Sequence, residues 1–163
     1  KARKQGVAVV EGNKYDLLEL HRAAAGSRDQ MAKATWHTIE VIDEAASTRD
    51  ARRVLVARGD DGRPHAAGYF VWDDDAMYYL VGSSDKDLRS SGATSLLLWT
   101  AIELAAERGL IFDFEGSMIR SIERFFRAFG GAPAAYSVVR HTPRVGLRVE
   151  RATKRAIRAM GRR

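Results

Sequence analysis

The stretch YYLVGSSDKDLRSSGATSLLLW, which runs from Tyr78 to Trp99, decides the fold of this chain. Its apolar start predicts a strand, and the run of good helix formers after Gly92 predicts a helix. A second stretch, FDFEGS at 112–117, predicts the next strand, with two carboxylates at its carboxyl end. A strand, a helix and a strand in this order place the helix N-terminus and the two acids at one end of a sheet, where α/β proteins bind ligands.

The rest of the sequence predicts further strands and helices on both sides of this unit. The predicted strands cover residues 7–10, 54–57, 66–72, 77–81, 110–114 and 135–140, and the predicted helices cover 15–25, 29–46, 93–108 and 119–129. Gly59–Gly62 and Asp73–Asp75 predict tight turns between antiparallel strands. We therefore expect an α/β (α+β) fold with a mixed, mostly antiparallel sheet flanked by helices, in one domain over residues 1–140, followed by a basic helix over 141–163.

Composition excludes several classes of site and protein. The chain has 163 residues and no cysteine, so disulfides, thiolate metal sites and a cysteine nucleophile are ruled out. The four histidines are far apart in the sequence, which predicts no metal site. No apolar run approaches the roughly 20 residues of a membrane span. These features are typical of a cytoplasmic protein.

The positive charge is concentrated at the C-terminus. Residues 140–163 hold nine Lys or Arg and one Glu, whereas the whole chain has a net charge of only +6. The segment predicts an amphipathic helix that docks on the domain or on a partner. Alternatively, its cations contact an anionic membrane surface, as in a protein peripheral to the inner membrane, or the phosphates of tRNA.

The entrance of the helix at residue 93 predicts an anion site. The first N–H groups of a helix have no partner within it, and the helix dipole favours an anion there by roughly 0.3–1 kcal/mol. Gly92 lets the backbone approach a ligand closely, and Arg89 adds a charge. The alternative is structural: Ser90 or Ser91 caps the helix, and Gly92 relieves a tight turn.

The two acids after the second strand are the candidate catalytic groups. Alternation places Asp113 and Glu115 on one face of a strand that we expect to lie inside the sheet. Close carboxylates beside aromatic rings raise the pKa of one of them, which suits a general base. The alternative is a structural ion pair with an arginine such as Arg89 or Arg120.

Tyrosines of the predicted strands supply a candidate proton donor. Tyr78, Tyr79 and Tyr136 stand in such strands, where core packing with a satisfied hydroxyl is the usual role. The alternative role is donation of a proton to a leaving group, for which we select Tyr136.

These residues resemble the GNAT acyltransferase superfamily. The resemblance is strongest from Tyr78 to Tyr136, where YYLVGSSD, GATSLLLW, DFEGS and FFRAFG follow in the family's order. Within the superfamily, the chain is most similar to the branch of Fem-type peptidyltransferases and related acetyltransferase domains of polysaccharide biosynthesis proteins. Fem enzymes have two such lobes and this chain has one, which fits a C-terminal fragment or a stand-alone relative. The partner that the resemblance implies is a second GNAT lobe or another copy in a homo-oligomer.

The resemblance also implies a site for acetyl-CoA or another acyl-CoA. The pantetheine arm would lie on the strand at Leu80, Val81 and Gly82. The pyrophosphate would lie at the helix entrance. The family pattern there is Arg or Gln, two residues, Gly, one residue, then Gly or Ala; Arg89 and Gly92 match it, and Thr94 stands at the last position. The implied pyrophosphate-binding residues are Arg89, Ser91, Gly92, Ala93, Thr94 and Ser95.

The expected reaction is transfer of an acyl group from a thioester to an amine. Glu115 would take the proton of the amine, Asp113 would orient the acceptor, and a backbone N–H of Leu80–Gly82 would bind the oxyanion. The acceptor would be a small molecule such as an amino sugar or a cell-envelope precursor. Two alternatives remain open: a Fem-type transferase that uses aminoacyl-tRNA, and a non-catalytic lobe that binds a partner.

Overall fold

The computed structural model describes residues 1–25, 30–137 and 139. The chain divides into two units, Lys1–Ala132 and Pro133–Arg163, and every helix and strand below belongs to the first. The elements are η1 (Ala2–Gln5), β1 (Ala8–Glu11), α1 (Lys14–Ala25), α2 (Gln30–Ser47), β2 (Arg52–Arg58), β3 (Pro64–Trp72), β4 (Ala76–Ser84), η2 (Arg89–Ser91), α3 (Ala93–Glu107), β5 (Ile111–Asp113) and α4 (Arg120–Arg127).

The five strands form one sheet in the order β1-β2-β3-β4-β5. The first four strands pair antiparallel, and β5 pairs parallel with β4 after the crossover through α3. Tight turns close the hairpins as predicted: Gly62 N–H donates to Gly59 C=O at 2.9 Å, and Asp73 Oδ1 accepts the N–H of Asp75 and of Ala76. The expected mixed, mostly antiparallel sheet is confirmed.

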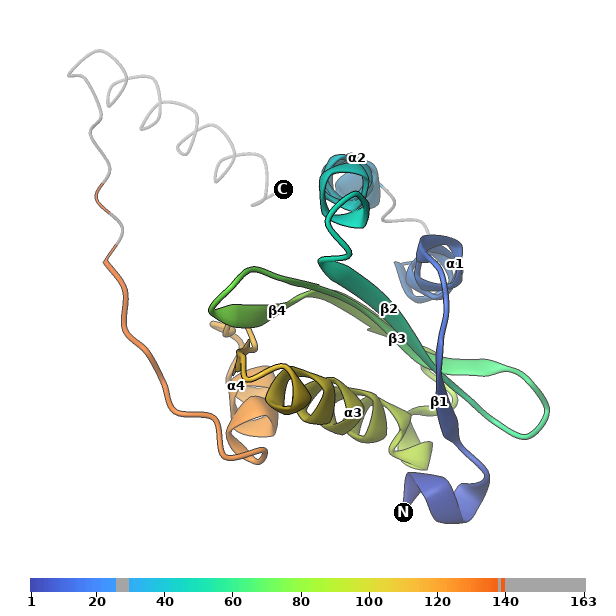
Figure 1. The fold of residues 1–163 in the computed structure, drawn as a ribbon. Helices are drawn as coiled ribbons and strands as arrows, with labels where there is room; N and C mark the ends of the chain where they lie inside the picture. Colours follow the sequence, from blue (N-terminus) through green and yellow to red (C-terminus); the bar gives the residue numbers. More distant parts are fainter. Residues whose placement is uncertain (26–29, 138, 140–163) are drawn as a thin grey trace, which may run out of the picture. The chain divides into compact units, whose positions relative to one another are not determined.

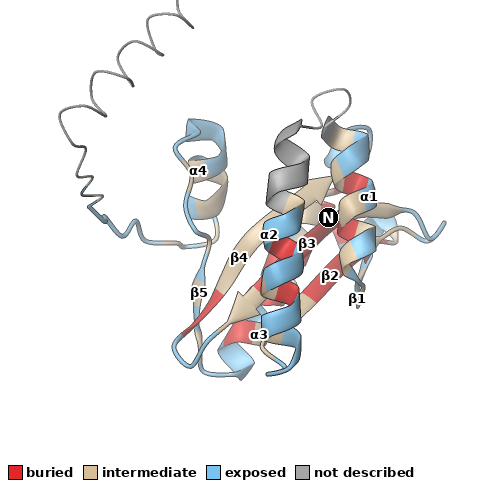
Figure 2. Ribbon diagram, turned by 90° about the horizontal axis from the view of Figure 1, so that it is seen from above, coloured by how far each residue is buried: buried red, intermediate tan, exposed pale blue. Residues whose placement is uncertain are grey.

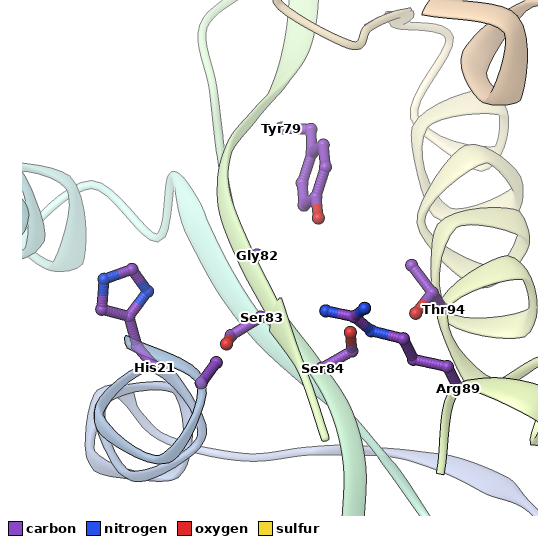
Figure 3. A pocket seen from close by; sticks show the side chains of 8 residues that line it. His21, Tyr79, Gly82, Ser83, Ser84, Arg89 and Thr94 are labelled. Carbon is purple, nitrogen blue, oxygen red and sulfur yellow. The ribbon is translucent and has the colours of Figure 1, made fainter. Parts of the chain in front are cut away.

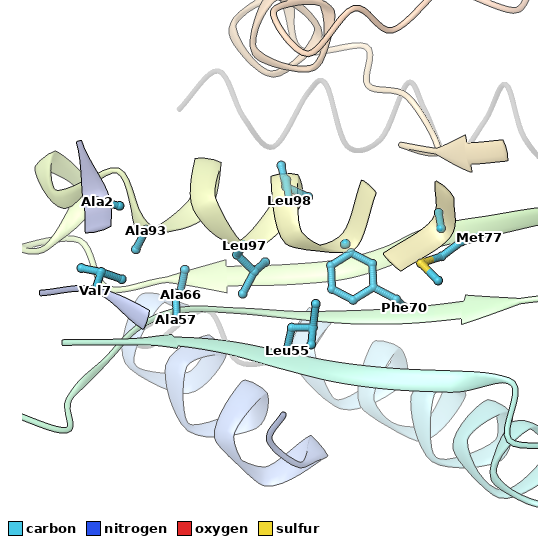
Figure 4. Close-up of a cluster of buried hydrophobic side chains, with 12 residues drawn as sticks. Ala2, Val7, Leu55, Ala57, Ala66, Phe70, Met77, Ala93, Leu97 and Leu98 are labelled. Atoms are coloured by element: carbon cyan, nitrogen blue, oxygen red, sulfur yellow. The ribbon is translucent and has the colours of Figure 1, made fainter. Parts of the chain in front are cut away.

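Helices cover both faces of the sheet and bury two separate apolar clusters. Helices α1 and α2 lie on one face, and α3 and α4 lie on the other (Figure 1). The buried residues follow the central strands and the helix sides that face them (Figure 2). The cluster under α3 includes Leu97, Leu98, Phe70 and Met77 (Figure 4). The cluster under α1 and α2 consists of Leu17, Leu20, Ile39, Val54, Val56, Ala67 and Tyr69.

The predicted strand at 135–140 is wrong for the residues that the structure describes. Residues 135–137 and 139 are exposed and have no strand structure, and 138 and 140 lie outside the described part. A strand requires a neighbouring strand for its hydrogen bonds. In the described sheet β5 is the last strand, so no ladder reaches these residues.

The C-terminal basic helix expected at 141–163 lies outside the described residues. Within the part of the chain that the structure describes, no helix is both long and apolar enough to cross a membrane.

A charged cluster on Asp43 ties α1 and α2 to the sheet. Asp43 is buried, with 8% exposure, and its carboxylate accepts hydrogen bonds from Lys14 Nζ at 3.0 Å and from the Tyr69 hydroxyl at 2.9 Å. Arg52 Nε lies 2.7 Å from it as a charge contact without hydrogen-bond alignment. Burial opposes ionisation of Asp43, but the Lys14 and Tyr69 hydrogen bonds and the Arg52 charge outweigh it, so its pKa is lowered.

We expect Asp43→Asn to lower the free energy of unfolding by about 2–4 kcal/mol, because it removes the charge that pairs with two partly buried cations and accepts the hydrogen bond of the buried Tyr69 hydroxyl. Urea denaturation measures this loss. A group with a lowered folded-state pKa stabilises the fold above its unfolded-state pKa, and this stabilisation disappears as the pH falls through the folded value. The difference in stability between this variant and the wild type should therefore shrink below about pH 4. Glu44→Gln, an exposed neighbour on α2, is the control and should change stability by less than about 0.5 kcal/mol.

Candidate functional site

A β-bulge at Leu80 shapes the strand that carries the site. Phe70 of β3 pairs with Tyr79 of β4, but the preceding residue of β3, Tyr69, pairs with Val81. Leu80 is therefore an extra residue in β4 with no partner in β3. A bulge adds twist and redirects the neighbouring side chains. Here it brings Tyr79 and Gly82 to the same face of the strand.

Strands β4 and β5 part immediately before the bulge. They pair only over Ala76–Tyr78 and Ile111–Asp113, while β4 continues to Ser84 beside β3. In the described residues, the other edge of β4 from Tyr79 to Ser84 has no strand partner. Unpaired main-chain N–H and C=O groups along such an edge are available to a ligand.

The entrance of α3 lies beside this open edge. Gly92 has a φ of 77°, a left-handed conformation that favours glycine. The Ser91 hydroxyl accepts the N–H of Ala93 at 3.2 Å. Both observations fit the structural alternative for Ser91 and Gly92, and the role of these residues in donor binding stays a prediction. The main-chain N–H groups of Thr94 and Ser95 form no hydrogen bond with a described residue, so they are available to a ligand.

A cavity of about 380 Å³ lies between β4, α1 and the entrance of α3. Strand β4 contributes Tyr79, Gly82, Ser83 and Ser84. Helix α1 contributes His21 and Ala24, and the α3 side contributes Arg89 and Thr94. In Figure 3 the Arg89 guanidinium extends from the α3 side toward the two serines of β4, and His21 approaches from α1.

The charge of the cavity suits an anion. No carboxylate is among its lining residues. Within the described residues, Arg89 forms no ion pair, so its guanidinium is free to bind a phosphate. Of the residues that we expected to bind the donor, the structure brings Gly82, Arg89 and Thr94 into the cavity lining.

Two expectations about the acids are wrong. Asp113 is the last residue of β5, an edge strand in the described sheet, and both Asp113 and Glu115 are exposed. Glu115 lies beyond the strand with a φ of 58°, so strand alternation does not apply to it. The position inside the sheet that we expected for these two acids is therefore absent from the described structure. Neither acid lines the cavity.

The conformation of Glu115 is nevertheless unusual. Its N–H donates to Asp113 Oδ1 at 2.7 Å, and neither acid forms an ion pair with a described residue, so the structural alternative is also not realised. A left-handed conformation at a non-glycine residue costs roughly 1–3 kcal/mol, and such strained residues cluster at functional sites. Asp113 and Tyr78 form the last residue pair between β5 and β4. Glu115 follows Asp113 by two residues, and Leu80 follows Tyr78 by two residues, so both stand just beyond the point where the strands part.

Tyr136 belongs to the second unit and is 85% exposed. Its catalytic role stays a prediction, because the structure does not place the second unit relative to the cavity.

Sequence reasoning missed His21 and Tyr79 as cavity residues. His21 gives no signal, because a lone histidine on an amphipathic helix fits a solvated position equally well. Alternation along β4 assigns Tyr79 to the core, and only the unforeseen bulge aligns it with Gly82. Among the described residues, no cluster of three or more acids or histidines is arranged to hold a metal ion.

Comparison with known proteins places the chain among acetyltransferase folds. Residues 6–136 match the family model described as acetyltransferase (GNAT) domain. No curated protein sequence matches the chain.

Three similar solved structures illustrate the shared fold. A putative acetyl transferase from Pyrococcus furiosus is 17% identical, with a TM-score of 0.63 over 84% of this chain and 99% of that one. An aminoglycoside 6′-N-acetyltransferase from Acinetobacter baumannii is 15% identical, with a TM-score of 0.58 over 86% and 100%. Glucosamine-6-phosphate N-acetyltransferase from Arabidopsis thaliana is 11% identical, with a TM-score of 0.56 over 84% and 99%.

We expect Gly82→Ala to destabilise the fold by about 1–3 kcal/mol, because an added Cβ would overlap the Tyr79 hydroxyl. Without that overlap, alanine in a strand should be neutral or slightly stabilising. Thermal or urea unfolding measures the change, with Ser83→Ala as the control. In a chain that already carries Tyr79→Leu, the same alanine should cost less than about 0.5 kcal/mol. An equal cost in both backgrounds would show that the overlap is not its cause.

Proposed function

The chain belongs to the GNAT acetyltransferase family, and on that basis we propose that it transfers an acyl group from acyl-CoA, with acetyl-CoA as the first candidate, to the amine of a small molecule. Acetyl-CoA is the usual donor of the family. We propose an amino sugar or a cell-envelope precursor as the acceptor, an idea supported by the amino-sugar substrate in the name of one structural neighbour.

The assignment of acyl-CoA as the acyl donor rests on one observation: in the described part of the chain, an arginine without an ion pair lies beside main-chain N–H groups without hydrogen-bond acceptors. Arg89 points into the cavity without a carboxylate partner in the described residues, and the unpaired N–H groups of Thr94 and Ser95 lie at the start of α3. A guanidinium and a helix N-terminus together bind phosphate oxygens well. The pyrophosphate of the donor would bind there.

The open edge of β4 would bind the pantetheine arm. Main-chain groups from Leu80 to Gly82 have no strand partner on that side within the described sheet. Amides of the donor would pair with them as an added strand does. The cavity volume of about 380 Å³ suits one part of the donor rather than all of it.

We assign the acid and base steps to the point where β4 and β5 part. Glu115 takes a proton from the ammonium form of the acceptor, and the resulting amine attacks the thioester carbon. The N–H of the bulge residue Leu80 stabilises the oxyanion that forms. The attack forms the C–N bond; the oxyanion then collapses with cleavage of the C–S bond, and the proton that the nitrogen loses passes to the departing thiolate. Asp113, which accepts the Glu115 N–H, holds the loop in position.

The Fem-type alternative differs in the donor. An aminoacyl ester on tRNA would need the cations of residues 140–163, which lie outside the described residues. Binding of tRNA that falls steeply with salt, and that disappears when these residues are deleted, would support this alternative. Binding of acetyl-CoA that is unaffected by the deletion would support our proposal.

Binding of acetyl-CoA should depend on Arg89. At 100 times its dissociation constant, acetyl-CoA should stabilise the fold by ~2.7 kcal/mol. Arg89→Ala should weaken its affinity about 10- to 100-fold, since a charge-assisted hydrogen bond contributes roughly 1.5–3 kcal/mol. Arg22→Ala, an exposed position on α1 with the same change in charge, is the control in calorimetry or thermal shift. Equal affinities of the two variants would contradict the phosphate assignment.

Substitutions of Glu115 should change both the stability of the fold and the rate of acetylation. Glu115→Gln should slow acetylation in an amine panel of amino sugars, aminoglycosides and polyamines by about 10²–10⁴. Glu115→Gly should raise the free energy of unfolding by about 0.5–1 kcal/mol, because glycine adopts a φ of 58° without strain, while losing the same activity. Release of CoA measures the rate. If His21→Gln slows the reaction and Glu115→Gln does not, the cavity histidine is the base instead.

A further inference from the structure

Helix α1 brings His21 to the open edge of β4. Leu17 and Leu20 are buried in the cluster under α1 and α2, and α1 packs against both β3 and β4. His21 and Ala24 follow Leu17 by one and two helical turns, so they lie on a side of α1 that meets the sheet. Both line the cavity, and His21 is half-buried. The position of the imidazole is therefore set by the packing of α1 on the sheet.

Two consecutive serines at the end of β4 extend the polar lining to both faces of the sheet. Successive side chains of a strand point to opposite faces, so Ser83 and Ser84 lie on different sides of β4. In Figure 3 Ser83 lies on the side of His21. Ser84 lies on the side of Arg89. All four residues line the same cavity, which therefore has one nitrogen-bearing side chain and one hydroxyl on each side of the open edge.

These polar groups have no partner in the described part of the chain. The side chains of His21, Ser83 and Ser84 form no hydrogen bond or ion pair with a described residue, and Arg89 forms no ion pair there. A neutral imidazole donates through one ring N–H and a protonated one through two. Donors that converge on a cavity without a carboxylate in its lining suit a ligand with several anionic oxygens.

The place of His21 along β4 identifies which part of the acyl donor it meets. We assign acyl transfer to the point where β4 and β5 part, at Leu80 and Glu115. Ser83 stands three residues beyond Leu80, which is roughly 10 Å along an extended strand. His21 therefore lies at the Arg89 end of the cavity and not at the thioester end. This place suits a contact with the phosphates better than proton transfer at the amine.

We propose that His21 donates a hydrogen bond to the pyrophosphate of the donor from the side of β4 opposite Arg89, so that the two side chains hold the pyrophosphate between them over the strand edge. The inference rests on the proposed function, in which Arg89 and the start of α3 bind the pyrophosphate from one side alone. It adds a second side chain, on a different helix and on the other face of the sheet.

The test measures the affinity of two ligands by calorimetry: CoA, and dephospho-CoA, which keeps the pyrophosphate but lacks the 3′-phosphate. His21→Ala should weaken both ligands by the same factor, about 3- to 10-fold. His21→Lys, which keeps a hydrogen-bond donor, should bind both at least as tightly as the wild type. The matched control is His37→Ala, an exposed histidine on α2 outside the cavity, which should change neither affinity.

A kinetic measurement separates phosphate binding from proton transfer. In the amine assay, His21→Ala should raise the KM for acetyl-CoA by about the factor that calorimetry gives. A fall in kcat at saturating acetyl-CoA, with the KM unchanged, would assign His21 to proton transfer and overturn the inference.

The binding outcomes separate this inference from the proposed function. Unchanged affinity of His21→Ala for both ligands would overturn the inference and leave the proposed function standing. Weakening of CoA alone would assign His21 to the 3′-phosphate and overturn the pyrophosphate contact. A wild-type protein that binds neither ligand would refute the proposed function itself. Alanine and lysine both suit a helix, so the difference between these two variants reports the lost donor and not a change in folding.

Discussion

The hydrogen-bonded ladder between β4 and β5 ends after three residue pairs, and the other parts of the site depend on that early end. A strand inside a sheet normally satisfies its main-chain groups on both sides. From Tyr79 onward β4 satisfies them only toward β3 in the described sheet. The bulge at Leu80 then twists β4 away from β5, and the cavity lies along the edge that this leaves open.

The two faces of the sheet supply different parts of the site. On the α3 face, the aromatic cluster fixes Tyr79, and the turn at Gly92 brings Arg89 and Thr94 to the cavity. On the other face, the charged cluster on Asp43 holds α1 and α2 against β2 and β3. Because His21 is on α1, its position at the cavity depends on that cluster. Stability of the helices and geometry of the site are therefore linked through one buried carboxylate and its partly buried cations.

The sequence predicts the order of the elements well, because it depends on periodicity and turn residues that are local. Residues 66–72 are a continuous apolar run, as in a buried strand, Gly59–Gly62 supplies the turn before it, and the segment after Gly92 is rich in helix formers. The predictions that are wrong depend on contacts between residues that are distant in the sequence. The strand at 135–140 requires a pairing partner that the described sheet does not provide. The buried location of Glu115 assumed that β5 is internal, whereas it is three residues long and at the edge.

The candidate site was predictable in outline only. Arg89 follows from its place at the helix entrance, and Gly82 follows only from the resemblance to the GNAT superfamily. Tyr79 and His21 do not, because their roles depend on a one-residue shift of register and on how α1 packs. The main-chain recognition that we propose along β4 would have an evolutionary consequence as well. A carbonyl or an amide of the backbone is the same whatever side chain is attached, so Leu80 and Val81 are free to drift as long as they suit the core. Proline would remove the donor, and any side chain at Gly82 would displace the tyrosine beside it. The donor site should therefore persist through sequence divergence that erases most recognisable identity, with glycine as the position least able to change.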